Sequence, residues 1–274
     1  MKRRSVKLCA LVLAVLFLLT ACGATDSASP PVQISGFESP EAAVVTYLEG
    51  LRDSDFDRMV GAFSLETHVE HFDLEAFLEH LRIYQLHFAP LPEVNEFTRA
   101  MNIELRRSMI VGQIRGQHLA LNHPERHEFV QGSTSFHNVM LEEDGVSDFI
   151  REFGEIFRAP AFHTLEIQGL LPLEWTAQEQ DVLERYAEVM ARTAATHGAD
   201  QMVSRIVVFT ISGDYYVLFL DLAAYAGRWY IHALGGLSAS LRNVPGDMHG
   251  IMVIRPDASD SFYDEIREFL IREW

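Results

Sequence analysis

Twelve histidines in a chain of 274 residues supply the side chains best suited to metal binding and proton transfer. His68 and His71 stand three residues apart, so a helix over this segment would place both rings on one side. Further ligands for such a pair are conceivable at Glu70, Asp73 and His80. A looser histidine group, without a regular pattern, comprises His118, His123 and His127. The sequence has no second half of a recognised zinc signature such as His-Glu-x-x-His, so we expect no metal site and no cofactor.

A single carboxylate interrupts a strongly apolar run near the C-terminal end, at Asp221. Period-two alternation in a strand places it on the face of Val217 and Phe219. A carboxylate among such neighbours must find a partner or shift its pKa, and Arg205 in the preceding apolar run is the candidate partner. The alternatives are a structural polar contact, a position at the sheet rim and a general base in a pocket.

His232 is the second candidate for acid–base chemistry in this part of the chain. Alternation places its ring on the face of Tyr230 and Leu234. Asp221, His232, Tyr230 and Arg205 would then contribute to one possible pocket, although a sheet-rim or solvent-facing position is the preferred interpretation for Asp221 and His232.

The common nucleophile and phosphate-binding motifs are missing from the sequence. It has neither a Gly-x-Ser-x-Gly elbow nor a Gly-x-x-x-x-Gly-Lys-Ser/Thr loop, and its two cysteines are Cys9 and Cys22. Acid–base catalysis in a pocket is the enzymatic route left open. We expect no catalytic residues, and binding without catalysis is the preferred interpretation.

The N-terminus has the layout of an export signal. Basic residues at Lys2, Arg3, Arg4 and Lys7 precede an apolar run over Leu8–Leu19, which is too short to span a bilayer as a helix. The run ends in Leu19-Thr20-Ala21-Cys22, which resembles a bacterial lipobox. In that motif the cysteine thiol is lipidated and the signal is cut ahead of it.

The lipobox resemblance implies a domain organisation and an address. Residues 1–21 form the signal peptide, 22–37 a flexible stalk of small polar residues and prolines, and 38–274 a single α+β domain. Cys22 carries the lipid and holds the domain on the extracytoplasmic face of the cell membrane. The alternatives are an ordinary signal peptide with an accidental cysteine, or an uncleaved anchor, and both still export the domain.

Charge restricts the possible partners. There are 39 acidic and 22 basic residues, for a formal net charge of −17. A general nucleic-acid-binding protein needs a basic face, so nucleic acid is not an expected partner. Anionic lipid would be repelled as well, so the lipid anchor must hold the protein at the membrane. The remaining partner, a protein or a small ligand, is left open.

Helical periodicity dominates the first half of the chain. Ser39 followed by Pro40 is typical of a helix start, because serine can cap the helix and proline needs no N–H at the first position. Amphipathic stripes predict further helices from Phe56, from Asp73 towards Pro90, over 93–117 and over 146–157.

The long helix over 93–117 is predicted to have distinct inner and outer sides. The inner stripe comprises Val94, Phe97, Met101, Leu105 and Met109. The outer side carries Arg99, Arg106, Arg107 and Arg115.

Strand patterns dominate the second half of the chain. We expect a strand over 164–171, a helix from the capping box at Thr176 to Gly198, and a last helix over 262–272. Between the two helices, three strand runs follow one another at hairpin spacing, over 202–211, 215–225 and 228–234. Helices followed by an antiparallel meander indicate an α+β fold.

Two segments are similar to the nuclear-transport-factor-two-like superfamily. Residues Ser39 to Asp57 resemble its opening helix pair, and the meander ending at Gly227–Ile231 resembles its closing strands. The resemblance implies a cone, in which N-terminal helices pack on a curved C-terminal antiparallel meander, here with a helical insertion over 73–157. Such folds host enzymes and binding modules alike, so the fold assigns no function.

The leading hypothesis is therefore a membrane-anchored lipoprotein that binds a partner or small ligand without catalysis. The alternatives are a small-molecule cyclase or isomerase on the same fold, and a solute-binding lipoprotein with two βα-alternating lobes.

The lipobox gives a first testable prediction. Replacing the lipidated thiol by Cys22→Ser should release the protein from membranes or leave an unprocessed precursor, because no other feature of the signal would retain the cleaved chain. Membrane fractionation measures the first outcome and intact mass the second. An unmodified residue at the mature N-terminus of the wild-type protein would refute lipidation.

Overall fold

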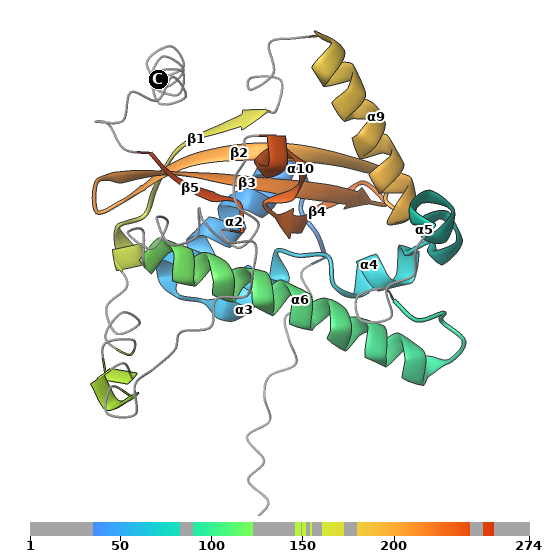
Figure 1. Ribbon diagram of the computed structural model, residues 1–274, viewed down its shortest axis with the longest axis horizontal. Coiled ribbons are helices and arrows are strands. Elements are labelled where there is room, and N and C mark those ends of the chain that lie inside the picture. Colours follow the sequence, from blue (N-terminus) through green and yellow to red (C-terminus); the bar gives the residue numbers. More distant parts are fainter. Residues whose placement is uncertain are drawn as a thin grey trace, which may run out of the picture. The chain divides into compact units, whose positions relative to one another are not determined.

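The computed structural model describes residues 35–82, 90–122, 161–172, 180–241 and 249–254, together with helical residues at 146–148, 150–151 and 154. Contacts join Ile34–Trp274 into one compact unit. Within it, most helices precede a sheet built largely by the last third of the chain, which confirms the α+β class (Figure 1). None of the helices described here combines the length and apolar content needed to cross a membrane.

The sheet has five antiparallel strands, which pair in the order β1-β2-β3-β4. Their bounds are β1 Glu166–Pro172, β2 Gln201–Ile211, β3 Asp214–Tyr225, β4 Arg228–Leu234 and β5 Ile251–Ile254. β4 pairs with the C-terminal half of β3, and β5 pairs with its N-terminal half. The predicted meander β2-β3-β4 is therefore confirmed.

Helices α2 (Pro40–Asp53), α3 (Phe56–Gly61) and α6 (Glu96–Asn122) lie on one side of the sheet (Figure 1). The start of α2 is as the sequence predicts, since the Ser39 hydroxyl accepts a hydrogen bond from the Ala42 amide at 3.1 Å. The apolar stripe of α2 is fully buried against the inner residues of β2, β3 and β4. A short helix, α4 (Glu66–His71), packs against α6, and the ion pair of Glu70 with Arg99 joins the two.

Helices α9 (Gln180–Thr196) and α10 (Gly236–Leu241) lie on the opposite side of the sheet (Figure 1). α9 contacts β2, and α10 contacts β3. Helix α5 (Leu74–Leu81) follows α4 and packs against α9, near one end of the sheet. Asp73 caps α5 as expected, but the helix ends at Leu81 and not near Pro90, because Arg82 adopts the left-handed conformation with φ 51°.

Helix α6 is confirmed, but its predicted inner face is wrong. Val94, just before the helix, and Phe97 are 75% and 72% exposed. The buried positions are instead Asn102, Arg106, Ile110, Ile114, Gln117 and Leu121. Hydrogen bonds explain the difference, because a buried polar group is tolerated where it has a partner. Asn102, for example, accepts from the Leu91 amide at 2.8 Å and donates to the Leu91 carbonyl oxygen at 2.9 Å.

A β-bulge interrupts β4. Leu222 pairs with Ile231, whereas the preceding residue Asp221 pairs with Ala233, which leaves His232 as the extra residue. The bulge overturns the expectation that His232, Tyr230 and Leu234 share one face, since Tyr230 and Leu234 pack in different core clusters. A bulge turns the side chain that it carries away from the regular alternation.

The end of the expected stalk lies beside β4. Phe37 and Trp229 exchange backbone hydrogen bonds of 3.0 and 2.9 Å. The Arg228 guanidinium donates to the carbonyl oxygens of Ser35 and Gly36. Other expected features lie outside the described residues: the signal peptide and Cys22, the capping box at Thr176, the helix over 262–272 and most of the one over 146–157.

The backbone of the turn after α9 lies very close to the backbone of α4, which leaves no room for a side chain at Gly198. Gly198 has φ +60°, and an added Cβ would lie 1.5 Å from the His71 carbonyl oxygen. Gly198→Ala should lower the free energy of unfolding by more than about 2 kcal/mol, because the two backbones must separate.

Gly227→Ala is the matched control. Gly227 has a similar φ of +74°, but nothing lies within 4 Å of an added Cβ. Its cost should be only that of the left-handed conformation, about 1 kcal/mol. Urea denaturation of both variants measures the difference, and equal losses would contradict the steric argument.

Candidate functional site

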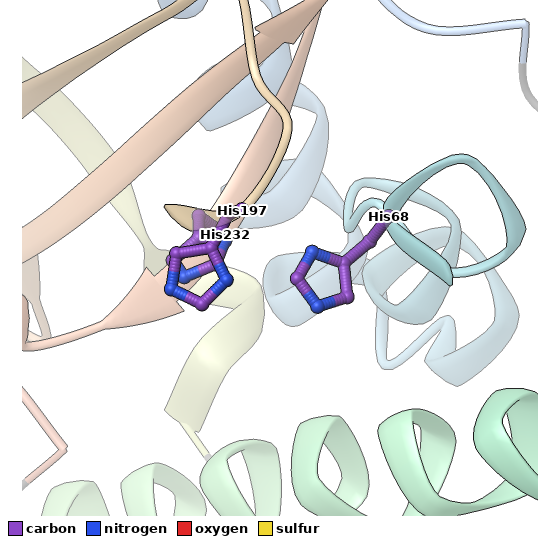
Figure 2. A group of neighbouring side chains, drawn as sticks. All are labelled: His68, His197 and His232. Carbon is purple, nitrogen blue, oxygen red and sulfur yellow. The ribbon is translucent and has the colours of Figure 1, made fainter. Parts of the chain in front are cut away.

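Three histidines that are far apart in the sequence come together at the β4 edge of the sheet. One ring nitrogen each from His68, His197 and His232 lies within 4.8 Å of the others. The ring centroids are 4.4 Å apart for His197 and His232, and 5.2 and 5.5 Å from these to His68. Figure 2 shows His68 approaching the other two rings from the opposite side. We call this group, with the neighbouring Arg106 and Tyr225, the histidine chamber.

Each histidine of the chamber belongs to a different element. His68 lies on α4, which the Glu70 ion pair holds on α6. His197 lies in the turn that ends α9, where its amide still donates to the Thr193 carbonyl at 3.0 Å. His232 is the bulged residue of β4. The three rings therefore meet only in the folded chain.

The imidazoles of the chamber are neutral at physiological pH. Burial and, to a smaller extent, the charge of Arg106 lower the pKa of His197 to about 4. Burial, with the nearby histidines and Arg106, also holds the pKa values of His68 and His232 well below the usual value. The buried Nδ1 atoms of His197 and His232 find no hydrogen-bond partner among the described residues. Such orphaned polar atoms are uncommon in folded proteins and call for an explanation.

Arg106 brings a positive charge to the chamber. It is 7% exposed and donates to the carbonyl oxygens of His232, at 2.7 Å, and Ser64, at 3.3 Å. Burial lowers its pKa to about 10, so the group stays charged at neutral pH. No carboxylate forms an ion pair with Arg106 in the part of the chain that the structure describes. A buried charge without a counter-charge is costly.

The Tyr225 hydroxyl lies between His68 and His197. Its hydroxyl lies 3.4 Å from the His197 carbonyl oxygen, to which it can only donate, and 3.2 Å from Nδ1 of His68. When the hydroxyl gives its single proton to the His197 carbonyl, it accepts from Nδ1–H of His68. The lone pair of His68 is then on Nε2, available to a ligand.

Comparisons with known proteins identify no family. No protein-family model and no curated protein matches the sequence. A cystatin-like protein from Ruminococcus gnavus has a similar structure, at 15% identity and a TM-score of 0.43. The match covers 79% of this chain and 44% of that protein, so the chain corresponds to less than half of its length. Function must be argued from the residues.

The structure brings together only part of the residues singled out in the sequence. His68 enters the chamber, whereas His71 is exposed and its Nδ1 contacts the Thr67 carbonyl oxygen at 2.9 Å. His232 is in the chamber, and Tyr230 packs with Tyr225 in a neighbouring cluster. Sequence reasoning missed His197 and Tyr225 and placed Arg106 outside. A histidine just before a helix-ending glycine was the one local signal for His197.

Asp221 lies on the α10 side of the sheet, as alternation predicts. It accepts a hydrogen bond from the Ser204 hydroxyl, which in turn accepts one from the Tyr186 hydroxyl on α9. The expected partner Arg205 alternates to the other face, where its Nε lies 2.7 Å from a carboxylate oxygen of Glu41. Ser204, which lies directly opposite Asp221 in the β2–β3 register, therefore binds Asp221 in place of the expected Arg205.

A cavity of about 840 Å³ lies between α9 and β2. Met190 and several alanines of α9 line one wall, and Ser204 and Arg205 lie in the other. The residues of the Tyr186–Ser204 hydrogen bond line this cavity. None of the five residues of the histidine chamber lines it, so the cavity and the chamber are separate.

The Asp221 contact yields a stability prediction. Asp221→Asn should lower the free energy of unfolding by about 1–3 kcal/mol, because a buried charge-assisted hydrogen bond is weakened. Asp214→Asn, at an exposed position of the same strand, is the control and should change little. Denaturant melts measure both variants. An unchanged or higher stability of Asp221→Asn would favour a general base held at a cost in stability.

Proposed function

We propose that this protein is a lipid-anchored, extracytoplasmic lipoprotein whose nuclear-transport-factor-two-like domain binds a small anionic ligand in the histidine chamber, without catalysis. The lipobox at Cys22 supports the anchor, and the helix pair with the antiparallel meander supports the family resemblance. The chamber supports the ligand class.

The observation that carries the proposal is the charge of Arg106, which forms no ion pair with the described residues. Its guanidinium is buried beside three neutral imidazoles, and its hydrogen bonds with the described residues go to backbone carbonyls. A small anion would supply the missing counter-charge, and imidazole N–H groups can donate to it as well.

An enzyme of the cyclase or isomerase kind is the second candidate. Its support is His232, which is buried in the chamber that also contains the Tyr225 hydroxyl. However, its lowered pKa makes it a weak base, and among the described residues no carboxylate orients its ring. A solute-binding lipoprotein of the two-lobed kind is less favoured, because residues Ile34–Trp274 form one compact unit.

Thermal unfolding in the presence of defined anions tests the proposal. Acetate, bicarbonate and phosphate are each titrated to 100 times their dissociation constant or to solubility. At least one should raise the melting temperature of the full-length protein by roughly 5 °C or more, the size expected of a site-specific ligand at that excess. The series is run after dialysis against EDTA and again with one equivalent of Zn²⁺, so that a metal-dependent ligand is not missed.

Two neighbouring arginines provide the variant and its control. Arg106→Met should abolish the shift while keeping the protein folded, since apolar replacement of an unpaired buried charge is often tolerated. Arg107→Met, on the less buried side of the same helix, should keep the shift. No shift with any anion under either condition, or an equal shift in Arg106→Met, would refute the anion site.

A further inference from the structure

The histidine chamber has the ligand set of a transition-metal site. Its three imidazoles are held by three separate elements, and no acidic or sulfur ligand joins them among the described residues. Imidazole nitrogen suits zinc, copper, nickel and iron, whereas magnesium and calcium require oxygen ligands. Three protein ligands also leave a fourth tetrahedral position open, as in zinc sites that bind water or a small ligand.

The distances allow such a site after a small movement. Tetrahedral zinc, with Zn–N bonds of about 2.0–2.1 Å, places its ligand nitrogens about 3.4 Å apart. In the chamber the nitrogens lie within 4.8 Å of one another, so the rings would turn inward by about 1 Å. Metal binding through Nδ1 would also give the orphaned nitrogens of His197 and His232 a partner.

The surroundings of His68 fit a metal ligand. A metal-bound histidine usually donates its other N–H to a neighbouring acceptor, which fixes the ring. The Tyr225 hydroxyl takes this position at Nδ1 of His68 and leaves Nε2 for the metal.

Arg106 determines what the fourth ligand must be. A divalent ion beside this guanidinium would place two positive centres in a buried space without an acidic side chain among the described residues. An anion bound to the open metal position can offset both charges and accept hydrogen bonds from Arg106. Neither the histidines nor Arg106 alone gives this combination.

We infer that His68, His197 and His232 bind a divalent transition-metal ion, for which zinc is the probe, and that a small anion facing Arg106 is its fourth ligand. The inference rests on the proposed anion site and specifies how that anion is held. It opposes the sequence-based expectation of no metal site, which considered His68 with His71 and not with His197 and His232.

Zinc binding to the full-length protein is the direct test. After EDTA dialysis, the protein should bind one equivalent of Zn²⁺ in calorimetry. With Co²⁺ it should show the intense visible absorption typical of tetrahedral cobalt, a readout that needs no variant. His197→Ala removes one ligand and should lower the affinity for zinc at least about 100-fold. Loss of a residue that only hydrogen-bonds to a ligand costs up to about that much. His71→Ala, an exposed histidine on the same helix as His68, should bind zinc as the wild type does.

The role of the anion is tested on the same samples. Loading with zinc should raise the affinity for the effective anion at least about 10-fold in the wild type, and Arg106→Met should lose this gain. Tyr225→Phe should weaken zinc about 10-fold through the lost outer contact to His68.

The outcomes separate the metal site from the anion site. An anion that stabilises the EDTA-treated protein, with no stoichiometric zinc, would overturn the metal inference and leave the proposed function standing. Zinc bound equally well by His197→Ala would overturn the ligand assignment. Zinc bound by the wild type with no effect on anion affinity would overturn the anion as the fourth ligand. Binding of neither zinc nor any anion would overturn both proposals.

Discussion

Arg106 carries a full positive charge into the interface between α6 and the edge of the sheet. Among the described residues, it donates to carbonyl oxygens on β4 and on the Ser64 segment. That segment is itself bound to β4, since Ile231 donates to Ala62 and accepts from Ser64. The Arg106 guanidinium therefore joins a helix, a loop and a strand, and it also makes the charge of the chamber positive. The fold tolerates this buried charge because the helix, the loop and the strand that Arg106 joins are also fixed by other contacts.

The bulge in β4 lies next to the interface of Arg106 and affects residues around both the histidine chamber and Asp221. Without the extra residue, regular alternation would put His232 on the face of Tyr230. The same shift in register brings Ala233 opposite Asp221 and places Gly236 against its carboxylate, where an added Cβ would lie 1.9 Å from an oxygen. The bulge therefore shapes the chamber, whereas the hydrogen bond from Ser204 to Asp221 follows from the regular register between β2 and β3.

Local sequence signals predicted the framework well. The cap at Ser39, the apolar stripe of α2 and the three strand runs depend on neighbours within a few residues, and all are confirmed. The site depends on features without a local signal. The inner face of α6 carries polar residues whose partners lie on other elements, so apolar periodicity selected the wrong side. The bulge reversed a face that alternation had assigned, and His197 acquires its importance only from neighbours in space.

The wide sequence separations within the chamber have a consequence for folding. His68 and Tyr225 stand 157 residues apart, and Arg106 and His232 stand 126 apart. The hairpins of the meander can close early, because their strands are adjacent in the chain. The chamber forms only when α4, α6, the end of α9 and β4 are docked. The other core contacts must therefore offset the entropy that is lost when these long loops close. We therefore expect the three rings to become ordered late in folding, when the helices have docked on the finished sheet.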